Sequence, residues 1–141
     1  CPHGERRARR AVIVLDASAA VEWLLQTTAG QHIEKRIYSR NESLHAPHLL
    51  DLEVAQVLRR LEREGSITAR RADEAIRDLA DLRVTRYPHV VLLPWIWQHR
   101  HNFSAYDAAY VALAGKLGAA MITRDSRLAS APGHTAAIEL F

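Results

Sequence analysis

The feature that most constrains the fold is an apolar run over residues 11–15 that leads directly into Asp16 and then into small residues. A continuous apolar run of this length predicts a strand that is buried on both faces, which is typical of a parallel sheet. Open α/β sheets carry their chemistry at the carboxyl edge of the strands, where Asp16 would stand. Because a buried strand rarely ends in an unpaired acid, Asp16 marks a candidate active edge.

The net charge of the chain is concentrated at its beginning. Residues 1–11 contain four of the 19 basic side chains and one of the 16 acidic ones, so residues 12–141 are neutral, with 15 of each. We interpret residues 1–11 as a disordered basic extension and residues 12–141 as one domain, which is long enough to bury a core. The overall charge therefore does not by itself indicate a nucleic-acid partner.

Cysteine content and hydropathy bound the cellular setting. Cys1 is the only cysteine, which excludes a disulfide framework and a thiolate metal cluster and favours a reducing, cytoplasmic setting. No window of about 18 apolar residues occurs, so we expect no transmembrane helix. The basic residues and the apolar run imitate a secretory signal, but Asp16 interrupts the run too early for one.

Helical and strand-like segments alternate along the rest of the chain. Residues 89–101 are ambiguous, and we favour a helix there, while residues 125–130 form at most a helical turn. The alternation predicts a mostly parallel sheet with helices on both faces. The helical period also places Leu52 and Ile76 among the inward-facing residues. Helices are expected over residues 18–26, 31–40, 48–64, 69–82 and 104–117, and strands over residues 11–15, 43–47, 83–87, 119–123 and 136–141.

The lengths of these elements bring further acids to the edge that Asp16 marks. Asp107 lies in the first turn of a predicted helix that extends about 15 Å, and the five-residue strand after it returns about 16 Å. The two lengths match, so Asp125, just past that strand, arrives close to Asp107. Glu53 lies in the early turns of the helix after the second strand, again on the carboxyl side. Four carboxylates therefore converge on one edge of the predicted sheet.

Each acid taken alone also has a structural interpretation. Asp107 follows Ser104 at the spacing of a capping box, so it could serve only its own helix N-terminus. Asp125 alone is typical of a turn, and Glu53 alone is typical of a solvated helix. Asp51 competes with Glu53, because two positions apart on a helix they cannot both face the cleft. The conjunction of the four acids, rather than any one of them, favours a functional site.

Four acids in one cleft repel one another, which would push some of them to the neutral form. A divalent cation resolves the conflict, and oxygen ligands with room for water are the pattern for Mg²⁺ or Mn²⁺. Such a site polarises a phosphoryl oxygen and lowers the pKa of a bound water for phosphodiester hydrolysis. Ser18 and Thr123, two residues from Asp16 and Asp125, would orient a carboxylate or water, or simply cap the chain.

Four segments carry these acids in order: residues 14–19 (VLDASA), 52–55 (LEVA), 104–114 (SAYDAAYVALA) and 122–125 (ITRD). They resemble PIN-domain ribonucleases, most closely the VapC toxins of bacterial type II toxin–antitoxin systems, with a likeness that covers the whole predicted domain. One departure is Gln56, where many members have asparagine; because an amide is kept, we expect little change.

The resemblance implies a PIN-like three-layer α/β/α sandwich with a five-stranded sheet. It further implies Mg²⁺-dependent cleavage of structured RNA such as tRNA or rRNA, homodimers, and inhibition by a VapB antitoxin. By this likeness the metal-binding carboxylates are Asp16, Glu53, Asp107 and Asp125. We expect Arg100 and Arg124, which flank the acidic cleft in sequence, to contact phosphates. The aromatic residues either stack on RNA bases or, as we prefer, pack in the core or at a dimer interface; they are Trp95, Trp97, Tyr106 and Tyr110.

Three other functions share part of this sequence pattern with the toxin ribonuclease. A haloacid-dehalogenase-like phosphatase also starts with a strand and an aspartate, but it needs a second acid where Ser18 stands. A catalytically inert RNA- or partner-binding module predicts the loss of at least one carboxylate, and all four are present. A PIN nuclease of RNA processing outside toxin systems stays open, and a neighbouring short antitoxin gene would distinguish it.

Overall fold

The computed structural model describes residues 11–134 and 136–141. In this part of the chain, five parallel strands form one sheet in the order β3-β2-β1-β4-β5. From β1 the chain adds β2 and β3 on one side and then β4 and β5 on the other, so the switch point lies between β1 and β4. Open α/β sheets form their ligand clefts at such a switch point. The strands are β1 (Val12–Leu15), β2 (Ser43–Pro47), β3 (Val84–Tyr87), β4 (Ala120–Thr123) and β5 (Ile138–Leu140).

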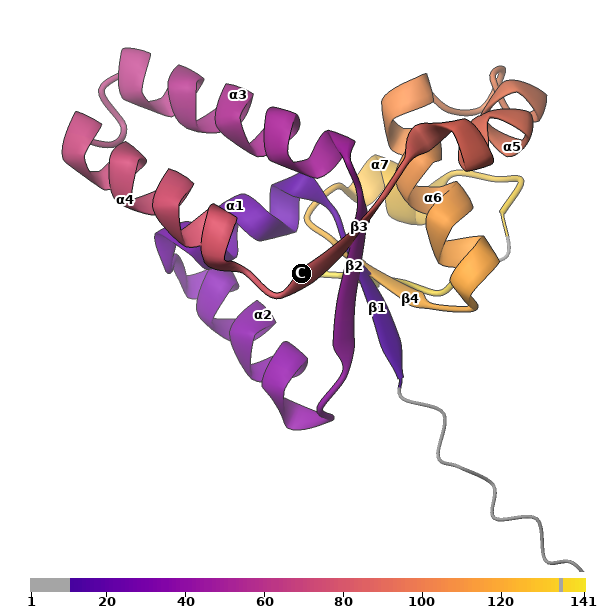
Figure 1. Ribbon diagram of the computed structural model, residues 1–141, viewed down its shortest axis with the longest axis horizontal. Coiled ribbons are helices and arrows are strands. Elements are labelled where there is room, and N and C mark those ends of the chain that lie inside the picture. Colours follow the sequence, from indigo (N-terminus) through magenta and orange to yellow (C-terminus); the bar gives the residue numbers. More distant parts are fainter. Residues whose placement is uncertain (1–10, 135) are drawn as a thin grey trace, which may run out of the picture.

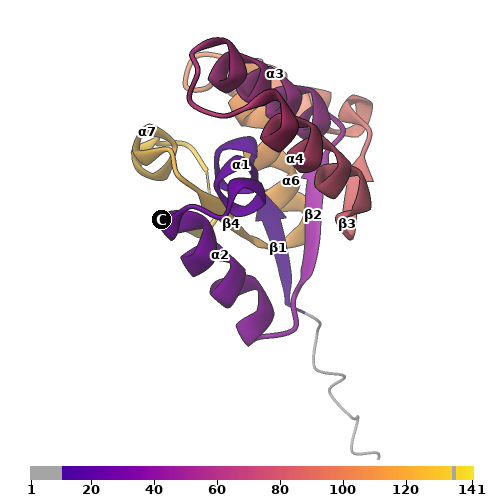
Figure 2. The same ribbon diagram turned by 90° about the vertical axis from the view of Figure 1, so that its left-hand side faces the viewer.

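Helices cover both faces of this sheet, which confirms the predicted three-layer α/β/α architecture. In Figure 1, α1 to α4 lie to the left of the strands and α5 and α6 to the right. Figure 2 shows β1 and β2 rising toward the pair α3 and α4, so the carboxyl ends of these strands face those helices. The helices are α1 (Ala17–Leu25), α2 (Thr28–Ser39), α3 (Leu49–Arg63), α4 (Ala69–Asp81), the 3-10 turn η1 (His89–Leu92), α5 (Leu93–Gln98), α6 (Ala105–Leu117) and α7 (Ser126–Ser130).

The central strand β1 is buried as its sequence predicts. Ile13, Val14 and Leu15 have no exposed surface, because neighbouring strands and both helical layers enclose them. The helix preferred for residues 89–101 is present as η1 and α5. None of the helices over residues 11–134 and 136–141 is both long and apolar enough to span a membrane. The predicted disordered extension falls almost entirely on residues 1–10, which lie outside the described residues.

Two side chains expected in the core are exposed. Leu52 of α3 is 74% exposed, because α3 turns Leu50 and Val54 inward and residues two positions away from them face outward. Ile76 of α4 is 41% exposed, because the neighbouring Ala75 takes the fully buried position. In both helices the sequence offers more apolar positions than the fold buries.

Gly30 lies where α2 begins against α1. A Cβ at this position would stand 1.9 Å from the Glu22 carbonyl oxygen and 2.4 Å from its carbon, and backbone atoms cannot rotate away. We expect Gly30→Ala to lower the free energy of unfolding by about 3 kcal/mol, measured by urea unfolding. Gly115→Ala is the matched control, since its Cβ would meet nothing within 4 Å at an exposed position of α6, and we expect a gain of about 1 kcal/mol. Equal stability of the two variants would contradict this close helix contact.

Arg36 of α2 ties the last strand to the segment before β2. Its Nε and Nη2 donate to the two carboxylate oxygens of Glu139 at 2.8 and 2.7 Å, and its Nη1 donates to Glu42 at 3.0 Å. The guanidinium holds the pKa of Glu139 below its ordinary value of 4.5. The stabilisation is therefore fully present above that value and is lost as the pH falls through the folded-state pKa.

This linkage predicts a pH-dependent effect of Glu139→Gln. We expect the variant to lose about 1 kcal/mol of unfolding free energy at neutral pH, since a forked arginine pair is broken at a partly exposed site. The difference should vanish at pH values well below 4.5, in denaturant unfolding followed across pH. Glu64→Gln is the control, because Glu64 lies 3.9 Å from Arg60 and both side chains are exposed near the end of α3. A loss that stays constant at all pH values would contradict the linkage.

Candidate active site

The four acids predicted from the sequence line one pocket, which we call the acid pocket. It lies at the carboxyl ends of β1 and β4, between the N-terminal halves of α3 and α6, and its volume is about 280 Å³. A larger cavity of about 610 Å³, lined in part by Trp23, Tyr38 and Leu82, lies near the amino end of β2 and does not include these acids. The lining of the acid pocket is Asp16, Ala17, Ser18, Glu53, Gln56, Val57, Asp107, Tyr110 and Asp125.

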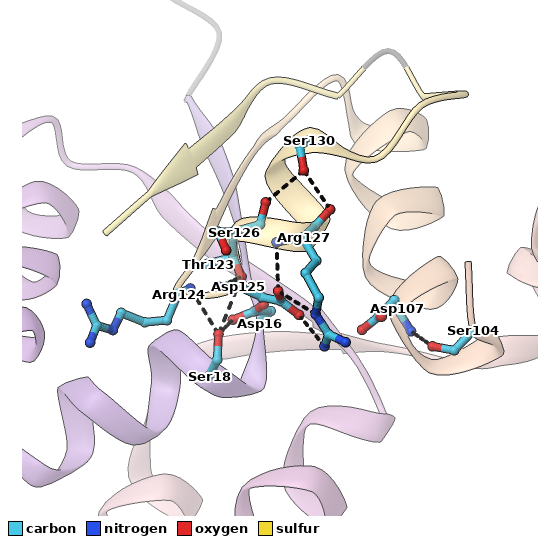
Figure 3. Close-up of polar contacts among 10 residues, drawn as sticks. All are labelled: Asp16, Ser18, Ser104, Asp107, Thr123, Arg124, Asp125, Ser126, Arg127 and Ser130. Carbon is cyan, nitrogen blue, oxygen red and sulfur yellow. Dashed lines mark hydrogen bonds and ion pairs between the residues drawn. The ribbon is translucent and has the colours of Figure 1, made fainter. Parts of the chain in front are cut away.

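Asp16 is the most rigidly held of the four acids. It caps α1, and its Oδ1 accepts from the backbone N–H of Ala19 at 3.0 Å and from the Ser18 hydroxyl at 2.7 Å. Its Oδ2 accepts from the Thr123 hydroxyl, as Figure 3 shows. Asp16 is 6% exposed, and this burial, with a smaller contribution from the charge of Asp107, raises its pKa above the ordinary value. Among residues 11–134 and 136–141, no basic side chain pairs with this buried carboxylate.

Ser18 and Thr123 also fix the end of β4 around this carboxylate. The Ser18 oxygen accepts from the backbone N–H of Arg124, and the Thr123 oxygen accepts from that of Asp125, both at 3.0 Å. Each hydroxyl therefore contacts Asp16 on one side and the chain after β4 on the other. This arrangement joins the two neighbouring strands at the edge where their acids lie.

The Asp107 carboxylate does not cap α6, although its spacing from Ser104 is that of a capping box. The Ser104 hydroxyl accepts from the backbone N–H of Asp107 at 3.1 Å, so Ser104 caps α6. Within the described residues, the carboxylate of Asp107 accepts no hydrogen bond, and it points toward the other acids in Figure 3. The first turn of α6 therefore presents an unpaired carboxylate to the acid pocket.

Glu53 reaches the pocket from α3 and has a partner that sequence reasoning missed. Its Oε1 accepts from the Tyr110 hydroxyl at 2.6 Å. Burial first, and then the charges of Asp107 and Asp16, raise the pKa of Glu53. Burial and Glu53 raise the pKa of the Tyr110 hydroxyl, so the phenol stays a hydrogen-bond donor. Asp107 and Tyr110 are three residues apart on α6, and this spacing, which puts them on one helix face, is the sequence pattern that could have predicted Tyr110 at the pocket.

Asp51, the competitor of Glu53, lies outside the pocket. Its two carboxylate oxygens accept from the Arg86 guanidinium at 2.8 and 2.9 Å. Arg86 of β3 also donates to the Leu79 carbonyl at the end of α4. Asp51 therefore ties α3 to β3 and α4, which leaves Glu53 as the acid of α3 that faces the pocket.

The Asp125 carboxylate forms an ion pair with the Arg127 guanidinium. It caps α7 through the backbone N–H of Arg127 at 2.9 Å, and the Arg127 guanidinium donates to its carboxylate at 3.3 and 3.2 Å. Arg127 holds the pKa of Asp125 below its ordinary value. The Arg127 side chain is 88% exposed, so it can leave the carboxylate at little cost. Figure 3 shows the guanidinium between Asp125 and the side of the pocket where Asp107 lies.

The two arginines expected at phosphates point elsewhere. Arg124 donates to the Phe141 carbonyl at 2.8 Å and extends away from the acids in Figure 3. Arg100 donates to the Trp97 carbonyl and lies 4.6 Å from the centre of the Trp97 ring. Basic side chains instead continue from the acid pocket along α3. A second hollow of about 300 Å³ shares Gln56 with the pocket and is otherwise lined by Arg59, Arg60, Arg63 and Glu64.

The four aromatic side chains divide between the two interpretations. Tyr110 is buried, and Trp95 stacks on His99 with ring centres 3.7 Å apart, as packing predicts. Trp97 and Tyr106 are 69% and 62% exposed, so the core does not account for them. Core packing therefore accounts for Tyr110 and Trp95, while a dimer interface or RNA stacking for Trp97 and Tyr106 stays a prediction.

The donor set of the acid pocket fits a hydrated magnesium-type cation. Within the described residues, no three carboxylate, imidazole or thiol groups already stand close enough to hold one metal ion. Mg²⁺ dehydrates reluctantly and uses one or two carboxylates directly, with the others bound through its waters. Three of these acids have no basic partner in the part of the chain that the structure describes, and two of the three have raised pKa values, so they supply the negative charge that such an ion neutralises.

A five-stranded parallel sheet with four acids in the cleft at its switch point defines a PIN-type nuclease domain. The PIN domain family matches residues 13–133, so the chain belongs to this family. Its relatives place it among the VapC ribonucleases. It is 48% identical over 120 residues to VapC ribonuclease Mb0985 of Mycobacterium bovis, which covers 83% of this chain and 88% of the relative. It is 42% identical over 128 residues to Ribonuclease VapC1 of Mycobacterium tuberculosis, with 90% and 96% covered.

Solved structures show the same fold at low sequence identity. VapC20 of M. tuberculosis, described as a Sarcin-Ricin loop cleaving toxin, is 17% identical with a TM-score of 0.62, and the match covers 84% of this chain and 93% of that one. VapBC2 from Rickettsia felis, bound to a DNA fragment from its promoter, is 9% identical with a TM-score of 0.65 over 92% and 98%. At these identities the likeness concerns the fold alone.

Proposed function

We propose that this ribonuclease is an Mg²⁺- or Mn²⁺-dependent endoribonuclease and the toxin of a type II toxin–antitoxin module. Its substrate is structured RNA of the tRNA or rRNA class. The observation that carries the proposal is the acid pocket, where four carboxylates from β1, α3, α6 and the end of β4 line one cavity at the switch point of the sheet. Its membership among the VapC ribonucleases supports the reaction class.

Some residues of the pocket are placed to hold a cation, and others orient those residues. The candidate ligands are Asp16, Glu53, Asp107 and Asp125. A bound Mg²⁺ or Mn²⁺ supplies Lewis-acid chemistry, polarising a phosphoryl oxygen and lowering the pKa of water. Ser18 and Thr123 keep Asp16 in one orientation through the hydrogen bonds described above. Without a cation, the unpaired acids would repel an approaching RNA phosphate.

Arg127 is placed to pair either with Asp125 or with an RNA phosphate, because its side chain is exposed beside the pocket. In the structure it pairs with Asp125, while it is almost fully exposed. If Asp125 held a cation, the exposed Arg127 guanidinium would be free to donate to an RNA phosphate at the mouth of the pocket.

The proposed partners are an RNA substrate, a VapB-like antitoxin and a second copy of the chain in a homodimer. The R. felis structure is of a complex named VapBC2, which supports an antitoxin partner for a protein of this fold. A short antitoxin gene beside the gene for this chain would favour the toxin over an RNA-processing nuclease. The presence of all four acids in one pocket disfavours an inert binding module.

Mapping of cleavage sites tests the proposal. Purified protein is incubated with total cellular RNA and Mg²⁺, Mn²⁺ or excess EDTA, and new 5′ ends are sequenced. We expect a few sites within one class of structured RNA in the presence of either cation, and none in EDTA. Unchanged cleavage in EDTA would overturn the metal-dependent mechanism, and cleavage spread evenly over messenger RNA would overturn the substrate class.

The basic hollow on α3 carries a prediction about substrate binding. Arg59 and Arg63 are exposed and, within the described residues, have no carboxylate at ion-pair distance. We expect a double change of both residues to glutamine to raise the KM for RNA about tenfold and to reduce the salt slope of binding by about two. The same double change at Arg70 and Arg77 of α4 is the control and should leave both quantities unchanged. Equal effects of the two pairs would mean that general charge, and not this hollow, binds RNA.

A further inference from the structure

Tyr110 is a buried member of the acid pocket that the proposed chemistry does not use. It follows Asp107 by three residues on α6, so both side chains lie on the helix face that borders the pocket. Its side chain is 3% exposed, and a buried tyrosine hydroxyl needs a hydrogen-bond partner. That partner is Oε1 of Glu53, 2.6 Å away.

Glu53 depends on this hydrogen bond more than Asp16 depends on any one of its own. Asp16 is held by two hydroxyls and a backbone N–H, whereas within the described residues Glu53 accepts one side-chain hydrogen bond, that from Tyr110. Glutamate also has a longer side chain than aspartate and loses more rotamer freedom when it is fixed. In the described part of the chain, this contact is the only side-chain hydrogen bond between α3 and α6.

We propose that Tyr110 is a positioning residue whose hydroxyl holds the Glu53 carboxylate in the acid pocket, ready for the cation of the proposed function. The hydroxyl occupies one side of Oε1, and Oε2 accepts no hydrogen bond within the described residues. Glu53 therefore keeps an oxygen for the cation or for one of its waters. Tyr110 acts through Glu53 and touches neither the cation nor the RNA.

Tyr110→Phe tests this role because it removes one oxygen and keeps the ring that packs in the core. We expect the dissociation constant for Mn²⁺, measured from the electron paramagnetic resonance signal of free Mn²⁺, to rise about tenfold, as for other partners of metal ligands. RNA cleavage should need about tenfold more cation and recover most of its rate at saturation. Tyr87→Phe is the matched control, since its hydroxyl lies 2.6 Å from His45 Nδ1 outside the pocket, and we expect wild-type Mn²⁺ affinity.

Two further variants separate positioning from a general loss of structure. Glu53→Asp keeps the carboxylate but withdraws it from the hydroxyl, so it should weaken Mn²⁺ binding to a similar degree. In a Glu53→Gln background, adding Tyr110→Phe should change Mn²⁺ affinity less than twofold, because no carboxylate is left to orient. Circular dichroism of each variant monitors the fold, and if Tyr110→Phe unfolds, its Mn²⁺ affinity is measured in the stabilised Gly115→Ala background.

The outcomes distinguish this role from the proposed function. Wild-type protein that binds Mn²⁺, together with Tyr110→Phe of the same affinity, overturns the role of Tyr110 alone. A tenfold loss that persists in the Glu53→Gln background also overturns it, because Tyr110 would then act without Glu53. Wild-type protein that binds no Mn²⁺ and cleaves RNA in EDTA overturns the proposed function, and the positioning role with it.

Discussion

Replacing Asp16 by asparagine is expected to reduce Mg²⁺-dependent RNA cleavage by more than about 100-fold, since even the partners of metal ligands cost 10–100-fold when they are lost. Asp16 is the acid that the fold holds most firmly, with three hydrogen bonds to its carboxylate. Asparagine keeps the shape and can still accept from the Ala19 N–H, but it removes the charge that would bind the cation. Initial rates on a defined RNA, at saturating cation, measure the loss.

The same substitution is expected to leave the protein at least as stable. Burial raises the pKa of Asp16, which means that the folded state disfavours its charged form. For an acid with a raised folded-state pKa, ionisation above its ordinary value costs stability, and asparagine removes that cost at neutral pH. A site acid that destabilises its own fold is the usual trade between stability and function. A large fall in Tm of Asp16→Asn would contradict this assignment.

Asp51→Asn is the matched control because it should have the opposite pair of effects. Asp51 lies two residues from Glu53 but pairs with Arg86 outside the acid pocket. We expect its loss to lower Tm, as breaking a forked carboxylate–guanidinium pair does, and to leave RNA cleavage close to wild type. If both Asp16→Asn and Asp51→Asn abolished cleavage while the fold persisted, the acid pocket would not be the site.

Cation binding is expected to stabilise the folded protein strongly. At a concentration one hundred times its dissociation constant, a ligand that binds only the folded state adds about 2.7 kcal/mol to the free energy of unfolding. For a domain of this size that corresponds to a rise in Tm of about 8 °C. The physical reason is that the cation neutralises the acids whose pKa values burial and mutual repulsion raise, Asp16 and Glu53.

Thermal unfolding in Mg²⁺, Mn²⁺ or EDTA measures this stabilisation. The rise in Tm should shrink as the pH is lowered, because protons compete with the cation for carboxylates whose pKa values are raised. Asp16→Asn is the control and should show little rise at the same cation concentrations. Wild-type protein whose Tm is the same in Mn²⁺ and in EDTA would contradict cation binding at the acid pocket.

Much of the fold was predictable because its signals are local. The run before Asp16 is continuous and apolar, and it forms the central strand with no exposed surface. Ser104 and Gly118 mark the two ends of α6 through hydrogen bonding and backbone conformation that depend on a few neighbouring residues. Leu52 was predicted wrongly because hydrophobicity shows that a residue can be buried, while the packing of α3 decides which residues are.

The candidate site was predictable in part for a similar reason. Parallel strands return to the same edge of a sheet, so helix and strand lengths bring Asp107 and Asp125 to the edge that Asp16 marks. The choice between Asp51 and Glu53 depended on family resemblance. The structure decides it through Arg86, which takes Asp51 out of the pocket. Their roles as metal ligands stay predictions that the experiments above address.

The sequence by itself determined the order of the elements, the parallel sheet and the edge where the acids collect, because periodicity, caps and element lengths are properties of neighbouring residues. Only the tertiary structure decided where individual side chains point. Tyr110 meets Glu53 across 57 positions of sequence, and Arg36 meets Glu139 across 103. The Arg124 side chain points away from the acids, because its guanidinium donates a hydrogen bond to the Phe141 carbonyl, 17 positions on. Such contacts depend on which distant residues the packed fold makes neighbours, and no local pattern encodes them.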